Sequence, residues 1–385
     1  MGGKAGLRQE LPWLAATGVA YVALGVLAVL LTRQPGNVAS AWVSSALLLG
    51  VICRRRQWPG AYLAVGFAAR AIVGWLVGDP ASLILAHAVG STLTVGLACA
   101  GLRLLAIDPR GLPDVPSLFW PVTLVGLVGS ALGGLVPAGV RTWLFDADFL
   151  LVWWTWIVAA SFGAVMILPP LLAAEGPAWT RFRSGMGWPR LLALFALTLL
   201  CTALCVGYLS RPFIVVALPL VAAALYVGRL GTALLCSANL VLMVGLRLYF
   251  DRHAVGGAEG LGIASRALSS VSFNFYAALT AGLPLVVSVL SSQRRLALEA
   301  LAQSRAELFE EKQLAETTLA SIGDAVITVD PRSRVRYLNR VAEEMTGWSL
   351  QEARDQPIDE VMRLLDAETG EAGLAPLAVA MRDRR

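Results

Sequence analysis

The chain has 385 residues, of which 57% are hydrophobic and only 15% are charged, and its mean hydropathy is +0.68. Soluble domains carry about 25% charged residues, so this composition excludes an ordinary soluble protein and indicates an integral membrane protein. The net charge of +5 does not indicate nucleic-acid binding, because the arginines lie mainly in short loops beside apolar stretches, where they orient a membrane protein.

About ten apolar stretches are candidate membrane spans: 11–32, 38–53, 58–77, 81–106, 117–140, 149–173, 190–209, 213–228, 231–250 and 268–291. The second and the eighth are short, and each is either a span or a re-entrant segment. A re-entrant hairpin over 213–250 would leave about eight spans. We therefore expect an all-α polytopic membrane helix bundle of about eight to ten spans, which forms a sensor domain over 1–291. Small residues cluster between Gly126 and Gly134, and this predicts close helix packing.

Basic residues alternate between richer and poorer loops. The richer loops carry Lys4 and Arg8, Arg54 to Arg56, Arg103 and Arg110, Arg181 to Arg190, Arg229, and Arg294 with Arg295. Loops rich in Lys and Arg stay in the cytoplasm. An even number of spans then places both termini in the cytoplasm, and we expect a multi-pass protein of a bacterial inner membrane.

The last apolar stretch runs into a charged segment without interruption. No Gly or Pro occurs between Pro284 and Gly323, so one helix is expected to continue as a linker over 292–321, a rod of roughly 55 Å. One heptad seam is apolar, with Leu301, Leu308, Ala315 and Ile322. Its companion seam is largely polar, which predicts a weakly self-associating linker. The alternative is a solvated helix with no role in dimerisation.

Residues 322–385 have the pattern of a small α+β unit. Ala325–Val329 and Val335–Leu338 predict a hairpin. Asn339 is placed to cap a helix over 340–346 that ends at Gly347. Ser349 is placed to cap a second short helix over 350–354.

Four polar residues inside predicted spans are candidate ligand-binding residues: Arg70, His87, Asn239 and Asn274. Arg70 and His87 lie at similar depth on either side of the turn at Gly78 and Asp79, so they are expected to form one anion-binding or polar pocket that faces the periplasm. In the alternative interpretation, Arg70 snorkels to the outer surface and His87 is a packing residue.

The chain shows no pattern of a catalytic or metal site. The five cysteines lie in or beside apolar stretches without accompanying ligands, so they are interpreted as membrane-core residues. His87 and His253 do not lie where a kinase phosphoacceptor would, and no P-loop, GGDEF motif or Ser-His-Asp set is found. We expect no cofactor and no enzymatic activity from this chain.

The membrane part resembles bacterial membrane-associated sensor domains of the MASE-one type over roughly 11–295. The resemblance is carried by WVSSALLLG at 42–50, QWPG at 57–60, GSTL at 90–93, the Trp153-Trp154 pair and Pro169. It implies about eight spans that precede a signalling output domain. The chain departs from the family pattern at Ser91 and Thr94, where Asn and Glu are common, and at Ala160, where Asp is common.

The C-terminal part resembles the first half of a PAS domain. The matching stretches are IGDAVITVD at 322–330, VRYLN at 335–339 and AEEMTGWS at 342–349. The PAS fold has five antiparallel strands, and only two are expected before Arg385, with 375–382 as the helix before the third. The resemblance therefore implies a partial PAS domain over 322–385, within a longer protein.

These resemblances imply a sensory receptor that passes a signal from the bilayer through the linker to a PAS domain and an output domain. The output they imply is a diguanylate cyclase or cyclic di-GMP phosphodiesterase, which acts as a homodimer. A membrane histidine kinase is the first alternative, and a transporter or channel, or a scaffold that recruits partners, are others. The signal, a small molecule or a membrane property, is not identified by the sequence.

The orientation is testable with reporter fusions. Fusions after Arg56, Arg183 and Arg295 should report a cytoplasmic location, and fusions near Asp146 and Gly257 should report a periplasmic one, because the basic loops stay inside. A paired alkaline phosphatase and fluorescent-protein reporter measures this. A periplasmic location after Arg295 would contradict the scheme.

Overall fold

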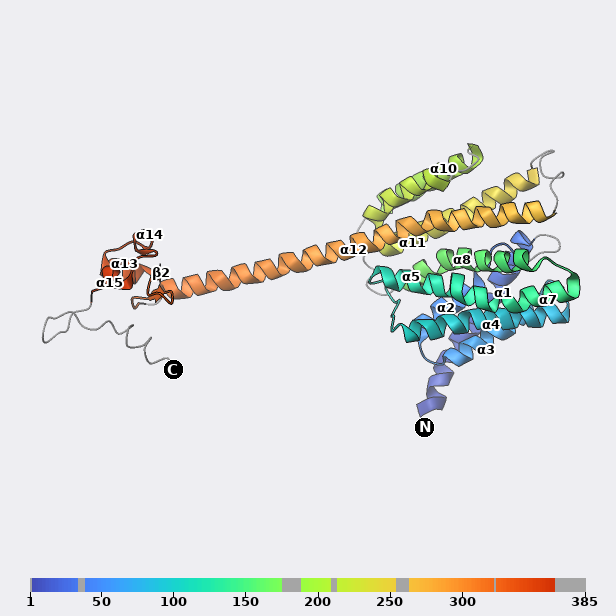
Figure 1. The fold of residues 1–385 in the computed structure, drawn as a ribbon, viewed down its shortest axis with the longest axis horizontal. Coiled ribbons are helices and arrows are strands. Elements are labelled where there is room, and N and C mark those ends of the chain that lie inside the picture. The colour runs from blue at the N-terminus through green and yellow to red at the C-terminus, as the bar shows by residue number, and fades with distance from the viewer. Residues whose placement is uncertain are drawn as a thin grey trace. The chain divides into compact units, whose positions relative to one another are not determined.

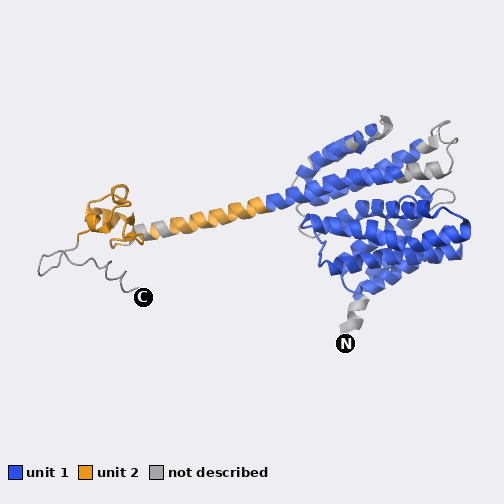
Figure 2. Cartoon of the chain, viewed as in Figure 1, with its two compact units in different colours: residues 1–296 blue, residues 297–385 orange. Residues whose placement is uncertain are grey.

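The computed structural model describes residues 2–33, 39–174, 188–208, 213–253, 263–321 and 323–363. The chain divides into two compact units, residues 1–296 and 297–385 (Figure 2). The finer division into 1–291, 292–321 and 322–385 stays a prediction. The fusion points Arg183 and Gly257 and the helix expected over 375–382 lie outside the described residues.

The first unit is built of helices alone within the part that the structure describes (Figure 1). They are α1 (Gly2–Thr32), α2 (Ser44–Arg55), α3 (Pro59–Leu76), α4 (Ala81–Leu104), α5 (Val115–Thr123), the π-helical turn η1 (Leu124–Val128), α6 (Gly129–Gly133), α7 (Leu135–Phe145), α8 (Phe149–Ala173), α10 (Trp188–Tyr208), α11 (Phe213–His253) and α12 (Ile263–Ser321). Helix α12 continues into the second unit.

Seven helical stretches in the described residues are long and apolar enough to cross a membrane. They are Gln9–Thr32, Pro59–Leu76, Ala81–Leu104, Val115–Phe145, Phe149–Ala173, Val215–Phe250 and Ser272–Leu314. An apolar face toward lipid surrounds a packed interior in such a bundle. The expected all-α polytopic membrane bundle is confirmed.

The span expected over 38–53 is wrong in its first part. Residues 39–43 are not helical, and α2 begins only at Ser44, so that helix has 12 residues. The non-helical backbone is stabilised by its neighbours: Trp42 N–H donates to the Ala159 carbonyl at 3.1 Å, and Ala41 N–H donates to Thr32 Oγ1 at 3.3 Å. Irregular backbone is tolerated at membrane depth where the protein satisfies its polar groups. The sequence shows only an apolar run here, and such a run does not distinguish a helix from non-helical backbone that neighbouring elements stabilise.

Gly163 on α8 allows the segment 39–43 to pass. A Cβ at position 163 would collide with the carbonyl oxygen of Trp42 and would come within 2.9 Å of Cα of Val43. Only glycine leaves room for this backbone to lie against the helix.

Helices α4 and α6 also pack backbone to backbone. A Cβ at Gly133 would collide with the Gly90 carbonyl, and one at Gly129 would lie 2.5 Å from the Thr94 carbonyl. The close packing predicted from the small residues at 126–134 is confirmed. The π-helical turn η1 lies in the same stretch, and the Gly126 carbonyl accepts a hydrogen bond from Ser161 Oγ at 2.8 Å.

Helix α11 is a hairpin of two helical arms. Gly228 has φ 75° and ψ 178°, which interrupts the helix. Residues near the two ends of α11 both contact Phe273 of α12. The Phe213 ring lies 5.4 Å from the Phe273 ring, and the Arg247 guanidinium carbon lies 5.1 Å from the centre of the Phe273 ring. The chain therefore folds back at Gly228, and the stretches expected over 213–228 and 231–250 are separate arms.

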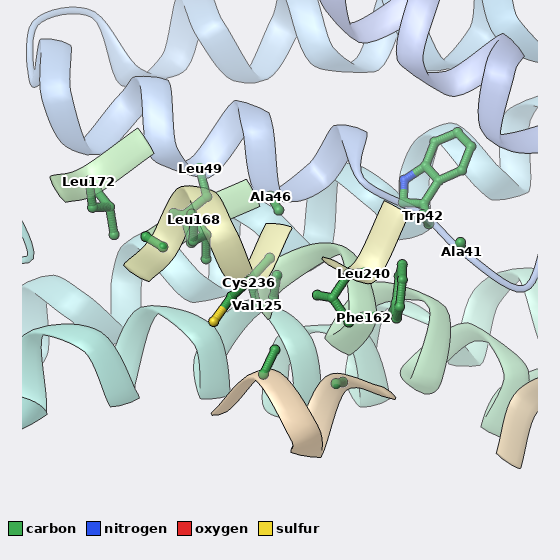
Figure 3. Packing of buried hydrophobic residues seen from close by; sticks show 14 of the residues in the cluster. Ala41, Trp42, Ala46, Leu49, Val125, Phe162, Leu168, Leu172, Cys236 and Leu240 are labelled. Atoms are coloured by element: carbon green, nitrogen blue, oxygen red, sulfur yellow. The ribbon is translucent and has the colours of Figure 1, made fainter. Parts of the chain in front are cut away.

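The core of the membrane unit takes buried residues from helices between α1 and α12. Figure 3 shows part of it, where Leu49 of α2, Leu168 of α8 and Leu240 of α11 are buried together with Cys236. The five cysteines are all free thiols. Cys53, Cys205 and Cys236 are buried members of this core, as the membrane-core interpretation predicts.

The second unit has the expected hairpin. Strands β1 (Ile327–Val329) and β2 (Val335–Leu338) pair antiparallel, with Ile327 opposite Leu338. They are followed by α13 (Arg340–Thr346), α14 (Leu350–Ala353) and α15 (Ile358–Val361). The side chains of Asn339 and Ser349 cap α13 and α14 as predicted. The helix α15 was not predicted.

The crossing at Gly163 gives a stability prediction. Gly163→Ala should lower the free energy of unfolding by about 1–3 kcal/mol, because the added methyl group overpacks a backbone contact. Gly96→Ala is the matched control, since nothing lies within 4 Å of a Cβ there, and it should be neutral or slightly stabilising. Thermal unfolding in detergent micelles measures both. Equal melting temperatures would contradict the close crossing.

Candidate ligand-binding site

A cavity of about 30 Å³ lies inside the membrane unit. It is bounded by α1, the segment 39–43, α2, α3, α4, α7 and α8, together with the turn 78–80. Its polar lining comes from Arg33, Ser45, Arg70, Asp79, His87 and Arg141. We call it the Arg70 cavity. Residues more than 100 positions apart in the sequence therefore line the same cavity.

Arg70 lies at the centre of this lining. Arg70 is buried on α3 together with Gly66, Ala69 and Val73, and it is only 5% exposed. Its guanidinium carbon lies 4.7 Å from the centre of the Trp42 ring. Nε and Nη1 have no hydrogen-bond acceptor among the described residues. Because Arg70 is buried beside a cavity, snorkelling to the surface does not describe it.

Asp79, in the turn between α3 and α4, is the carboxylate of the cavity. Arg33 Nη2 lies 2.7 Å from its Oδ1, and His87 Nδ1 lies 3.7 Å from its Oδ2. Burial alone would raise the pKa of Asp79, but the contacts with His87 and Arg33 outweigh burial and lower that pKa to about 2. Asp79 is therefore an anion at any physiological pH, and Arg33 already engages it.

Aromatic rings form the other walls. The His87 ring stacks on Trp156 with centroids 5.6 Å apart and an interplanar angle of 24°. Trp42 Nε1 donates to Ser45 Oγ at 3.1 Å, which fixes the ring that faces Arg70. Arg141, which is 5% exposed, adds a third cation. Flat aromatic rings thus form part of the lining, beside the charged groups.

The structure brings together two of the four residues predicted from sequence. Arg70 and His87 line the cavity, whereas Asn239 and Asn274 do not. Asn239 lies on α11, where its Nδ2 donates to the Leu235 carbonyl at 3.0 Å and its Oδ1 accepts from Thr202. Asn274 lies on α12, and its Nδ2 donates to the Ser40 carbonyl at 2.6 Å.

Sequence reasoning missed Arg33, Asp79, Arg141 and the two tryptophans. Arg33 follows α1, Asp79 lies in the turn between α3 and α4, and Arg141 lies one turn before the end of α7. All three residues lie at the same end of the bundle. The predicted topology already places them at one membrane surface, and this could have grouped them with Arg70 and His87. Thr94 and Ala160, two positions of departure from the family pattern, also line the cavity.

Two further clusters of charged residues in the membrane unit form ion pairs. Glu10 accepts from Tyr62 Oη at 2.7 Å and lies 3.7 Å from Arg55. A larger cavity of about 440 Å³ contains Asp108, which Arg56 and Arg110 contact at 2.7 and 2.8 Å. The hydrogen bonds from Arg110, with the Arg56 charge, lower the pKa of Asp108 to about 2. Within the described residues, no group of three or more His, Cys, Asp or Glu side chains could hold a metal ion.

A membrane helix bundle is thus followed by a small unit with a two-stranded sheet, and comparison with protein families assigns both parts. The MASE1 family matches residues 13–295, and the PAS fold matches residues 313–368. The chain belongs to the MASE1 family.

One curated relative is similar over a short stretch. The probable diguanylate cyclase DgcE of Escherichia coli (strain K12) is 38% identical over 63 residues, which is 16% of this chain and 6% of the relative. The chain therefore spans a small part of that relative's length. No solved structure matches the chain.

The Arg33–Asp79 pair gives a prediction with a defined pH dependence. In a double-mutant cycle of Arg33→Gln and Asp79→Asn, the coupling energy should be about 1–3 kcal/mol, because the carboxylate is buried and its partner is charged. The folded pKa of Asp79 lies below its usual value, so the coupling should be complete above about pH 4. It should decline as the pH falls from about 4 toward 2.

Thermal unfolding of the four proteins in detergent micelles measures this coupling. A cycle of Arg110→Gln and Asp108→Asn is the control, since both partners are more than a third exposed and such pairs contribute about 0–1 kcal/mol. Equal coupling in the two cycles, or a buried-pair coupling that vanishes already at pH 6, would contradict the assignment.

Proposed function

We propose that this chain is the sensory part of a bacterial inner-membrane receptor and that the Arg70 cavity is its ligand site. The observation that carries the proposal is the buried guanidinium of Arg70, which faces a cavity with two of its nitrogens unpartnered among the described residues. Ionisable groups inside a membrane bundle are costly and mark functional sites. The proposed orientation, with both termini in the cytoplasm, places the Asp79 end of the bundle toward the periplasm.

The segment 39–43 supplies a route from the cavity to α12. Ala39 and Trp42 line the cavity, and Ser40 lies between them. The Ser40 carbonyl accepts the hydrogen bond of Asn274 on α12, which continues to Ser321. In this proposal the segment 39–43 has two conformations, and the ligand binds the cavity more tightly in one of them. Ligand binding would then shift the segment and, through the Ser40–Asn274 hydrogen bond, α12. Asn274, expected as a ligand-binding residue, is in this proposal the coupling residue.

The output proposed for the full protein is cyclic di-GMP turnover, by a diguanylate cyclase or phosphodiesterase. A MASE1 region followed by a PAS region supports a membrane sensor, and the similarity to the probable diguanylate cyclase of Escherichia coli favours this output. We propose a homodimer in the full protein. Leu301, Leu308 and Phe309 of α12 are exposed in the single chain and are available to a second copy.

The experiment uses the full protein that contains this chain. Purified in nanodiscs, it should convert GTP to cyclic di-GMP or hydrolyse cyclic di-GMP. Labelling of a histidine by radioactive ATP, with no guanylate product, would instead assign a histidine kinase. Absence of both activities would contradict a receptor of either kind.

Coupling is tested in cells by comparing cyclic di-GMP levels. Arg70→Gln should change the cyclic di-GMP level. In the Asn274→Ala background the change caused by Arg70→Gln should be about fivefold smaller, because the link from the cavity to α12 is then missing. The control is Ser291→Ala, since the partners of that hydroxyl among the described residues are the Val287 and Ser288 carbonyls of its own helix. An undiminished effect of Arg70→Gln in the Asn274→Ala background would contradict this route.

A further inference from the structure

We propose that the Arg70 cavity binds a small planar oxyanion, either a free inorganic ion or the carboxylate of a small organic acid. The inference rests on the proposed receptor function for its biological meaning, but the binding itself is a separate claim. The charge, the backbone, and the size and shape of the cavity each support it.

The charge of the cavity calls for an anion. Among the described residues that line it, three are arginines and only Asp79 is a carboxylate. Asp79 is engaged by Arg33 at 2.7 Å. The Trp42 ring lies 4.7 Å from the Arg70 guanidinium carbon, and a ring face is a weaker partner for a cation than a hydrogen-bonded carboxylate. A buried cation without a hydrogen-bonded anion is strongly unfavourable, so an anion from solution would be stabilised here.

The backbone adds a second source of positive potential. Helix α2 has 12 residues and begins at Ser44, and Ser45 of its first turn lines the cavity. Its N-cap residue, Val43, has a side chain that makes no capping hydrogen bond. The first N–H groups of a helix and its dipole favour an anion at this end. The N-terminus of α2 and the Arg70 guanidinium thus converge on one space.

The size and shape select the class of anion. A volume of about 30 Å³ holds on the order of two water molecules, so a phosphate ester or nucleotide does not fit. The walls are flat, with the Trp42 ring over Arg70 and the stacked His87 and Trp156 rings. Guanidinium groups bind planar oxyanions such as carboxylates with two parallel hydrogen bonds. Formate, acetate, nitrate and bicarbonate meet these requirements.

Arg33 indicates where the ligand would enter. Its side chain is 29% exposed, whereas that of its partner Asp79 is 3% exposed. The pair lies at the end of the bundle formed by the end of α1 and the turn between α3 and α4. In the proposed orientation this end faces the periplasm, so the ligand would come from outside the cell.

The test uses the full protein in nanodiscs and measures its melting temperature in sodium formate, acetate, nitrate or chloride. Ionic strength is held constant with sodium methanesulfonate, whose anion is monovalent but tetrahedral. A ligand that binds only the folded protein raises the melting temperature in a saturable way. Line broadening of ¹³C-formate measures binding directly. Formate or nitrate binding identifies a free oxyanion, and binding of acetate alone identifies the carboxylate of an organic acid.

Two variants make the test specific. Arg70→Gln should weaken binding at least about tenfold, since it removes a charged hydrogen-bond donor. Ala160→Asp places a tethered carboxylate at the cavity wall, where it should pair with Arg70 and raise the melting temperature without any added anion. Ala160→Asn occupies the same space without the charge and should not raise the melting temperature. This matched pair keeps the test decisive if Arg70→Gln does not fold.

Equal melting temperatures of Ala160→Asp and Ala160→Asn, or no binding of formate, acetate and nitrate to the unsubstituted protein, would overturn the inference. Stabilisation by chloride as strong as by formate would overturn the planar class. If binding is found but Arg70→Gln leaves cyclic di-GMP output unchanged, the receptor proposal fails and the binding inference stands. If Arg70→Gln changes the output but no oxyanion binds, the reverse holds.

Discussion

The architecture of the membrane unit depends on one backbone crossing, where residues 39–43 pass over α8 at Gly163. A helix at this place would have filled the space with side chains and satisfied its own backbone groups. The non-helical segment instead donates from Trp42 N–H to the Ala159 carbonyl, and α2 starts among buried residues. The cavity, the buried first turn of α2 beside it and the position of the Trp42 ring all follow from this crossing.

Arg70 makes the same region energetically demanding. Its guanidinium is removed from water and lies against the Trp42 ring, and its Nε and Nη1 have no hydrogen-bond acceptor among the described residues. Burying a charge without a hydrogen-bonded partner costs several kcal/mol, and the close helix packing at Gly129 and Gly133 is one of the contributions that offset such a cost. In the proposed ligand site, an anion that pairs with Arg70 would stabilise the bound state strongly, which is the property that a receptor requires.

The crossing also explains how the proposed site and the proposed output can communicate. The segment 39–43 contributes to the cavity on one side and binds Asn274 of α12 on the other. An irregular segment has fewer internal hydrogen bonds than a helix, so it can shift without breaking a helical ladder. Helix α12 has no Gly or Pro after Pro284 until it ends at Ser321, so a displacement in its membrane part is not absorbed by a local break.

Sequence alone determined the membrane class, the long helix through Arg294 and Arg295, and the hairpin and capped helices after Gly323, because these depend on local composition, periodicity and capping residues. It also placed Arg70 and His87 at one depth. It could not place Asp79, Arg141 or Trp156 beside them, since contacts between distant helices leave no local pattern. The non-helical backbone at 39–43 and the partner of Asn274 were decided only by the tertiary structure, because a neighbouring helix, and not the segment itself, supplies the hydrogen bonds that make them stable.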